Sequence, residues 1–265
     1  MEKTIAQILS DRGIEVFGQL PAAEADMLKP PMEGVRAYIM MLLPYHTAGI
    51  KRNVALFACF PDYHALTRKL LGEVCAELES RFPGETFKAT VDSSPVAEVG
   101  CAAKCGLGVI GDNGLLINER YGSYCFIAEI ATTLELPPLK RDTGAFACLN
   151  CGACVNACPH GALSADGFDA DKCVSHVSQK KGQLTPEEEE MISSADFIWG
   201  CDRCQDACPL NAGLGDTRLE CFKATAPIVT EEMADDPVFF KASAFAWRGK
   251  QTILRNIALQ KRKNQ

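Results

Sequence analysis

Fourteen cysteines occur in this chain of 265 residues, and many of them are regularly spaced. Cys148, Cys151, Cys154 and Cys158, with Pro159 directly after them, form the pattern C-x2-C-x2-C-x3-C-P. Bacterial proteins use this spacing to bind a pair of [4Fe–4S] clusters, and the fourth cysteine then reaches the second cluster. Thiolates are soft ligands that favour iron–sulfur clusters or zinc over harder ions. The spacing therefore predicts a cluster site.

A second cysteine motif is incomplete. Cys201, Cys204 and Cys208-Pro209 match its last three positions, but Ile198 occupies the place of the first cysteine. Cys173, between the two motifs, is the best candidate for the missing ligand. Crossed ligation then predicts two [4Fe–4S] clusters, one held by Cys148, Cys151, Cys154 and Cys208 and the other by Cys158, Cys173, Cys201 and Cys204.

Structural zinc is the alternative for these cysteines, since paired cysteines commonly bind zinc in a tetrahedron. Two interleaved motifs that both end in Cys-Pro are typical of clusters rather than of zinc ribbons. Six cysteines lie outside both motifs and are expected to be small buried side chains: Cys59, Cys75, Cys101, Cys105, Cys125 and Cys221.

The composition is that of an ordinary folded protein, with 47% apolar and 23% charged residues. Residues 1–4 do not resemble an export signal, and the longest apolar run, 37–43, is too short to cross a bilayer. Thiols kept reduced for metal binding then indicate a cytoplasmic protein without a membrane partner.

The net charge of −7 argues against a surface built mainly for nucleic acid. The segment from Lys241 to Gln265 differs, because it has seven basic residues and no acidic one. It is expected either to pack on the body as an amphipathic helix or to bind phosphates.

Hydrophobic periodicity predicts the elements that position these motifs. Short apolar strands alternate with amphipathic helices over the first part of the chain, which predicts an α/β layered fold. Asp92 or Ser94, followed by Pro95, is expected to cap a helix. We expect helices at 4–11, 62–81 and 96–105, strands at 35–43, 54–59 and 86–91, and two further strands on either side of the turn at 118–122.

Domain boundaries follow from changes in composition. Pro137-Pro138 marks a linker, after which the density of cysteines rises. Thr185-Pro186, followed by four glutamates, is expected to begin a capped helix. The predicted organisation is an α/β domain at 1–138, a ferredoxin-like double [4Fe–4S] domain at 139–220 and a short C-terminal helical segment at 221–265.

Several short motifs together resemble the epoxyqueuosine reductase family, which is related to reductive dehalogenases. They are Asp62-Tyr63-His64, Val91-Asp92-Ser93-Ser94-Pro95, Gly106-Leu107-Gly108, Gly111-Asp112-Asn113, Tyr121-Gly122-Ser123, Gly200-Cys201-Asp202-Arg203-Cys204-Gln205, Pro209-Leu210-Asn211 and Leu254-Arg255-Asn256. The resemblance covers most of the chain. It implies a cobalamin held in the α/β domain beside the double-cluster domain, and reduction of an epoxide on a modified tRNA base to an alkene.

The resemblance also implies roles for individual residues and partners. Asp92 is the implied proton donor, for which burial would have to raise its pKa. Its alternative role is that of a helix cap. Corrin contacts are implied for Gly106, Gly108, Gly111, Asn113 and Ser123, although the glycines are equally suited to making turns. The implied partners are tRNA and an external electron donor such as a flavodoxin or ferredoxin.

Three features depart from the family pattern. His64 is expected to be a packed helix residue rather than a cobalt ligand, because Thr67 replaces the glycine of the corrinoid-binding pattern. Val99 and Asp112 stand where arginine and lysine are usual, which removes positive charge from the expected site. Longer members add a helical-repeat domain after the position of Gln265, so the chain resembles a short form. These departures leave open another electrophilic substrate, or a non-catalytic electron carrier that serves a partner enzyme.

Overall fold

The computed structural model describes residues 2–164 and 166–263, and the chain divides into two compact units. Unit 1 comprises Met1–Pro44 and His64–Asn150, and unit 2 comprises Tyr45–Tyr63 and Cys151–Gln265. This division differs from the predicted boundaries, because residues 45–63 belong with the cysteine-rich unit rather than with the domain predicted at 1–138. Residues 221–265, predicted as a separate segment, also belong to unit 2; of these, 264–265 lie outside the described residues.

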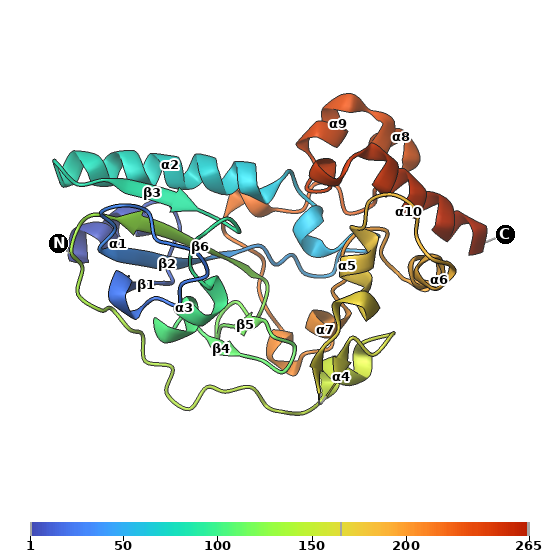
Figure 1. Ribbon diagram of the computed structural model, residues 1–265, viewed down its shortest axis with the longest axis horizontal. Helices are drawn as coiled ribbons and strands as arrows, with labels where there is room; N and C mark the ends of the chain where they lie inside the picture. Colours follow the sequence, from blue (N-terminus) through green and yellow to red (C-terminus); the bar gives the residue numbers. More distant parts are fainter. Residues whose placement is uncertain (1, 165, 264–265) are drawn as a thin grey trace. The chain divides into compact units, whose positions relative to one another are not determined.

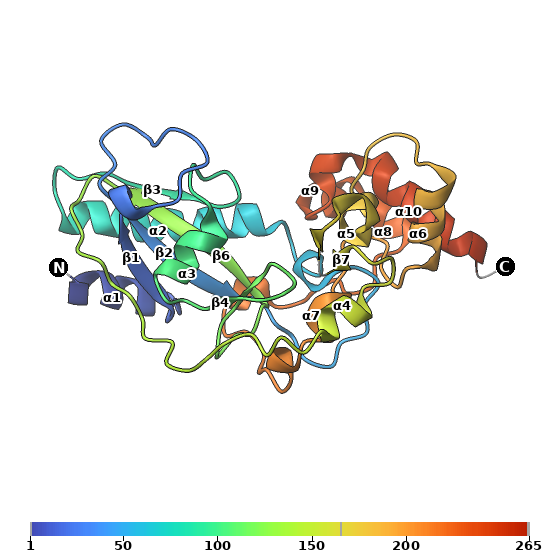
Figure 2. The same ribbon diagram turned by 60° about the horizontal axis from the view of Figure 1, so that its bottom comes forward.

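An antiparallel four-stranded sheet forms the centre of unit 1, with strand order β1-β2-β6-β3. Figures 1 and 2 show α3 on one face of the sheet and α2 on the other. The elements of unit 1 are α1 (Glu2–Ser10), β1 (Phe17–Pro21), the 3-10 helix η1 (Ala22–Glu24), β2 (Ala37–Pro44), α2 (Tyr63–Arg81), β3 (Phe87–Thr90), α3 (Glu98–Lys104), β4 (Val109–Ile110), β5 (Leu116–Ile117) and β6 (Cys125–Thr132). The predicted α/β layered fold class is confirmed.

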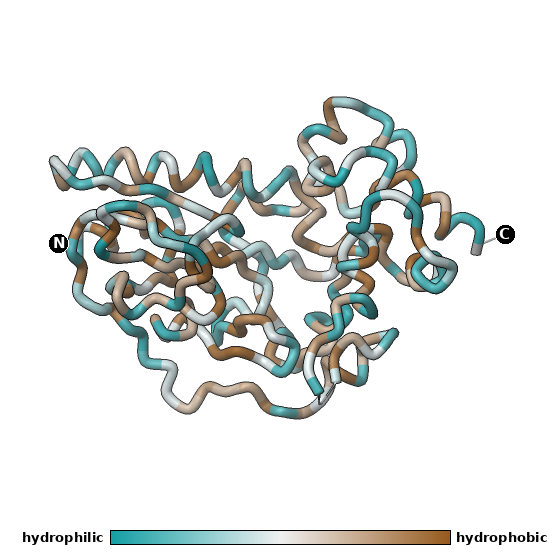
Figure 3. The backbone as a smooth tube through the Cα atoms, viewed as in Figure 1, coloured by the Kyte–Doolittle hydropathy of each residue, from teal (hydrophilic) through white to brown (hydrophobic). Residues whose placement is uncertain are grey.

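The central strand β2 is buried along its whole length because both faces of the sheet are covered. Side chains alternate across a strand, so Tyr38, Met40 and Leu42 enter the cluster packed against α3, whereas Ile39 and Met41 face the other layer. The helix α2 is amphipathic, and Figure 3 shows its hydrophobic and hydrophilic residues alternating along the tube. Its buried residues are Thr67, Leu71, Val74, Cys75 and Leu78.

Unit 2 is built mainly of short helices. Its elements are η2 (Leu56–Ala58), α4 (Ala153–Ala157), β7 (Leu163–Ser164), β8 (Gly167–Phe168), η3 (Ala170–Lys172), α5 (Val174–Ser178), α6 (Pro186–Ser194), α7 (Arg203–Asp206), η4 (Pro209–Asn211), η5 (Glu220–Phe222), α8 (Glu231–Asp235), α9 (Pro237–Ala242), η6 (Ala246–Arg248) and α10 (Lys250–Lys263). Helix α10 packs on α6, α8 and α5, as the amphipathic prediction requires. No helix in the described ranges is long and apolar enough to cross a membrane.

Local chemistry explains where two helices begin. Thr185 caps α6 through a complete capping box: its side chain accepts the Glu188 N–H, and Glu188 accepts the Thr185 N–H in return. The predicted helix start at Thr185-Pro186 is therefore confirmed. The predicted cap of α3 is wrong, because Ala97 is the N-cap and makes no side-chain cap bond. Ser94 instead accepts the N–H of Val96, two residues on.

The strand predicted at 54–59 is also wrong. Val54 forms one parallel bridge to Trp199, and Leu56–Ala58 is a 3-10 helix. Backbone donors that a sheet would need are used elsewhere: the Ala58 N–H bonds to the nearby Ala55 carbonyl, and the Leu56 N–H donates to the carboxylate of the sequence-distant Asp202 at 2.6 Å. Residues 54–59 therefore form an irregular segment that contacts Trp199 and Asp202 of unit 2.

Candidate functional site

Two helical turns carry the cysteine motifs in unit 2. Cys154 lies within α4, and Cys158 is the C-cap of that helix. Cys204 lies within α7, and Cys208 follows the C-cap Ala207 and is the N-cap of η4. Helices α4 and α7 contact each other. The two halves of the cysteine pattern therefore meet in space.

The predicted cluster ligands of unit 2 influence one another electrostatically. Cys201 is within electrostatic range of Cys158 and Cys173, and Cys204 is within range of Cys201, Cys173 and Cys154. Burial raises the pKa of Cys201 to about 11 and that of Cys204 to about 12. Crossed ligation assigns one cluster to Cys158, Cys173, Cys201 and Cys204, so the donor chemistry fits a [4Fe–4S] group.

Cys173 occupies the N-cap of α5, directly after η3, and this places it beside the second motif. Cys158 also accepts the Ala162 N–H on its sulfur at 3.2 Å, a type of bond that tunes cluster potentials. Cys148 belongs to unit 1 by its contacts, so its ligation stays a prediction from spacing.

A buried ion pair holds the second motif in place. Asp202, between Cys201 and Cys204, is 1% exposed and accepts a bond from Arg52 at 3.0 Å. Arg52 also pairs with Asp206 at 2.9 Å. Burial raises the pKa of the Asp202 carboxyl, and the Arg52 charge opposes that shift. Sequence reasoning missed Arg52, because its partner is about 150 residues away.

The Leu254-Arg255-Asn256 motif also has a structural role in unit 2. The Asn256 amide donates to the carbonyls of Ser178 and Ile198, each at 2.8 Å, and the residue is fully buried. The Arg255 guanidinium donates to the carbonyls of Lys180 and Gly182 at 2.9 and 2.8 Å. The motif therefore fastens α10 to the loops after α5 and before α7.

Asp92 lies in unit 1 on a tight turn after β3. Its side chain is 47% exposed, so the burial that the implied proton-donor role would need is not present in this structure. The alternative role of helix cap is also wrong, since α3 begins six residues later. His64 Nε2 lies 3.2 Å from Asp92 Oδ2. His64 therefore contacts the Asp92 carboxyl group, a contact that the prediction of a packed helix residue did not include.

Two glutamates stand behind this turn. Glu98 accepts the N–H of Asp92 at 2.9 Å, and Glu129 lies fully buried on β6. Burial is the main cause that raises the pKa of Glu98 to about 8, with the negative charges of Glu129 and Asp92 adding to the shift. Burial also raises the pKa of Glu129. Neither residue was predicted as part of a site.

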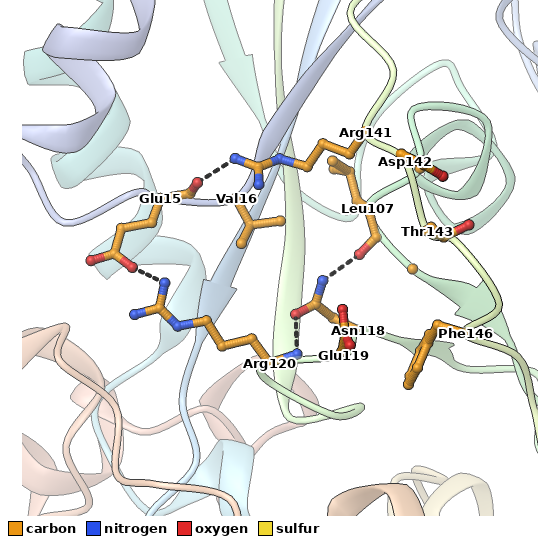
Figure 4. Close-up of a pocket in the computed structure, with 12 residues that line it drawn as sticks. Glu15, Val16, Leu107, Asn118, Glu119, Arg120, Arg141, Asp142, Thr143 and Phe146 are labelled. Carbon is orange, nitrogen blue, oxygen red and sulfur yellow. Dashed lines mark hydrogen bonds and ion pairs between the residues drawn. The ribbon is translucent and has the colours of Figure 1, made fainter.

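A pocket of about 190 Å³ lies elsewhere in unit 1 and is lined in part by Gly106 and Gly108. Figure 4 shows Arg120 and Arg141 converging on Glu15 along one side, with Phe146 on the other. Its volume is below the ~300–1,000 Å³ typical of sites for drug-sized ligands, and a corrin is larger than such a ligand. This pocket alone does not hold a corrin.

Packing within unit 1 accounts for glycine at the predicted corrin contacts. A Cβ on Gly106 would stand 2.0 Å from the Arg141 carbonyl oxygen, and one on Gly108 would stand 2.4 Å from that of Ile117. A Cβ on Gly111 would meet the Ile117 side chain at 2.7 Å. The contacts predicted for these three glycines and for Asn113 and Ser123 therefore stay predictions.

Asn113 and Ser123 differ in their surroundings in unit 1. The Asn113 side chain accepts the Leu115 N–H at 3.2 Å in the β4–β5 turn, and Ser123 is buried. Val99 and Asp112 are the two residues that replace the basic side chains of the family pattern. Val99 packs against the hydrophobic core between α3 and the sheet, and Asp112 is exposed in the same turn as Asn113. An apolar residue at position 99 is thus explained by packing.

The chain is similar to one protein family model and to several curated proteins. Residues 147–211 match the 4Fe-4S double cluster binding domain, which contains all eight predicted ligands. Epoxyqueuosine reductase of Lactococcus garvieae is 33% identical over 74% of this chain and 57% of its own length. That of Leadbetterella byssophila is 30% identical over 87% of this chain and 78% of its own. The chain spans little more than half the length of several such relatives.

Solved structures share the fold. Epoxyqueuosine reductase from Streptococcus thermophilus aligns with 100% of this chain at a TM-score of 0.82 and 23% identity. An epoxyqueuosine reductase with an epoxyqueuosine-modified tRNA-Tyr stem loop aligns at 0.80 and 22% identity, covering 98% of this chain and 80% of its own. A B12-dependent reductive dehalogenase aligns at 0.50 and 18% identity, covering 97% of this chain and 37% of its own.

Proposed function

Since the chain belongs to the epoxyqueuosine reductase family, we propose that it reduces the epoxide of epoxyqueuosine in tRNA to an alkene. Two electrons and two protons convert the epoxide to an alkene and water. The double-cluster domain passes electrons one at a time. The observation that carries the proposal is Asp92, which presents a half-exposed carboxyl group held beside His64.

Cobalamin is part of this proposal. When bound, it supplies the two-electron chemistry at the carbon–oxygen bond that neither a cluster nor a side chain can perform alone. A B12-dependent relative with the same fold supports its presence. No contact with the corrin is assigned to Gly106, Gly108 or Gly111, whose missing side chains are accounted for by internal packing.

The residues of this chain handle the protons. Asp92 donates one of the two protons to the departing epoxide oxygen, because its half-exposed carboxyl group is accessible to a bound substrate, and solvent water supplies the other proton. His64, 3.2 Å away, orients the Asp92 carboxylate and returns a proton to it after turnover. The Glu98 carboxyl group fixes the Asp92 backbone at 2.9 Å.

The proposed partners are tRNA and an external electron donor, and the proposed location is the cytoplasm. A relative solved with a modified tRNA stem loop supports tRNA as the substrate carrier. An external flavodoxin or ferredoxin is proposed as the electron donor, because the chain's clusters must be reduced one electron at a time. Cysteine ligands that stay reduced favour the cytoplasm.

The test begins with anaerobic purification in the presence of cobalamin, followed by iron and cobalt analysis and an assay with epoxyqueuosine-modified tRNA. About eight irons and one cobalt per chain, with formation of the alkene, support the proposal. Asp92→Asn should lower kcat by about 10²–10⁴-fold at unchanged metal content, with Asp11→Asn, at an exposed position after α1, as the matched control. Eight irons without cobalt and without turnover would instead favour an electron carrier.

A further inference from the structure

Two carboxyl groups of unit 1, those of Glu98 and Glu129, lie behind the turn of Asp92. Glu129 lies on the central strand β6, where it pairs with Met40 on one side and Thr90 on the other. Glu98 is the first residue of α3, which packs on that face of the sheet. Glu98 and Glu129 lie within electrostatic range of each other, and the negative charge of Glu129 raises the pKa of Glu98. Two carboxyl groups placed in this way can hydrogen-bond to each other only if one of them carries a proton.

The surroundings of Glu129 show where that proton is needed. One of its oxygens accepts the Thr90 hydroxyl, and the residue is 0% exposed. Its other oxygen, Oε2, is buried and meets no donor at hydrogen-bond geometry within residues 2–164 and 166–263, although the Ser94 hydroxyl is close enough to favour the ionised form of Glu129. A buried acceptor without a donor is costly. A proton on Glu98 supplies the donor and leaves Glu129 as the acceptor.

The same Glu98 carboxyl group holds a strained backbone. Asp92 has a φ of +55°, which is uncommon for a residue with a side chain. The Ser93 N–H bonds to the Val91 carbonyl at 2.7 Å, which closes a three-residue turn with Asp92 at its centre. The outward N–H of Asp92 donates to Glu98 Oε1 at 2.9 Å. A conformation of this kind persists only when its neighbours hold it.

We propose that Glu98 and Glu129 share one proton, and that this protonated pair is a positioning device that holds the turn of Asp92. Glu98 uses one oxygen for the Asp92 N–H and shares the proton with Glu129. The pair does not touch the reacting atoms. Its importance for turnover rests on the proposed function, whereas its effect on the turn does not.

Loss of the shared proton should release the turn. An ionised Glu98 would face the negative charge of Glu129 and of Asp92 at close range. The other groups near the pair are Tyr38 on β2, Cys101 on α3, the Ser94 and Thr90 hydroxyls, and His64 beside Asp92. Of these, only His64 carries positive charge when protonated, and it loses that charge as pH rises. The turn should therefore loosen under alkaline conditions.

The test is hydrogen–deuterium exchange of the peptide covering residues 90–96 in the purified full chain, at about pH 6 and about pH 9.5, corrected for intrinsic exchange. In the wild type, protection should fall by roughly tenfold or more at the higher pH. Glu98→Gln keeps an acceptor for Asp92 and a donor for Glu129, so its protection should not change with pH. Glu98→Ala should be poorly protected at both values, and Glu73→Gln, at an exposed position on α2, should behave as the wild type.

Wild-type protection that is equal at both pH values would overturn the shared proton, and a well-protected Glu98→Ala would overturn the positioning role. If Glu98→Gln does not fold, Glu129→Gln tests the same pair, because it keeps an acceptor for Thr90 and removes the second charge. Turnover then separates the two proposals. Glu98→Ala should lower kcat about tenfold or more at similar KM. A turn that loosens as expected in a chain without turnover would leave the pair intact and reject the reductase function.

Discussion

His64 Nε2 lies 3.2 Å from Asp92 Oδ2, which brings the start of α2 against the turn after β3. Because this contact holds the carboxyl group in one orientation, we expect His64→Asn to lower kcat by roughly ten- to a hundredfold while KM changes little. Steady-state assays with epoxyqueuosine-modified tRNA would measure this. The matched control is His176→Asn, at an exposed position on α5 in unit 2, and equal losses in both variants would contradict the role.

Cys173 supplies a ligand that neither motif contains. Replacing it with serine should remove one cluster, so iron should fall from about eight to about four per chain after anaerobic reconstitution. Cys221→Ser is the matched control, because Cys221 lies outside the matched domain and should leave the iron content unchanged. Full iron in the Cys173→Ser variant would remove Cys173 from the ligand set.

Arg52 neutralises a buried carboxylate between two cluster ligands. Its side chain is 13% exposed and that of Asp202 is 2% exposed, so Arg52→Met should leave a buried charge unpaired. We expect a loss of about 3–5 kcal/mol in the stability of unit 2. Urea titration followed by circular dichroism and by the visible absorbance of the clusters would measure it. Lys51→Met, at an exposed position, should change stability by about 0.5 kcal/mol or less.

Asn256 satisfies two buried carbonyls at once. Asn256→Leu fills a similar space without donors, so the Ser178 and Ile198 carbonyls would lose their partner. The expected cost is about 1–3 kcal/mol, measured as a shift in the midpoint of urea unfolding. Gln251→Leu on the exposed side of α10 is the control. If the two variants had equal midpoints, the bonds of Asn256 would contribute nothing net.

Glu98 should make the stability of unit 1 depend on pH. Its pKa is about 8 in the folded chain against an ordinary value of 4.5, so the folded state holds a proton that the unfolded state releases over this interval. Stability is therefore fully present below about pH 4.5 and is lost as pH rises through about 8. Thermal unfolding midpoints should fall across this range in the wild type and fall less in Glu98→Gln, with Glu73→Gln following the wild type. Parallel curves for all three would contradict this assignment.

Local patterns predicted much of this molecule. The helix start capped by Thr185 and the α/β layering were predictable because each depends on nearby residues or on periodicity. The strand predicted at 54–59 failed because Asp202, far away in sequence, takes a backbone donor there. The cysteine spacing was informative because cluster geometry imposes it.

The surroundings of Asp92 were less predictable. Its role was implied by family resemblance, but the contact with His64 and the pair formed by Glu98 and Glu129 depend on sheet register. In a sequence, Glu129 looks like a polar residue on an otherwise apolar strand, and Glu98 looks like an ordinary first-turn acid. Only the pairing of β6 with β3 brings Thr90 and Glu129 together.

Residues 45–63 belong to unit 2 although they lie between two stretches of unit 1. The chain therefore crosses from one unit to the other three times, and no single cut separates them. A fragment that starts at residue 139 or 151 would contain every cysteine of the second motif but would lack Arg52, the counter-charge of Asp202. The cysteine-rich unit therefore cannot be excised as one continuous segment, and transferring it to another protein would require both residues 45–63 and the segment from residue 151 onward.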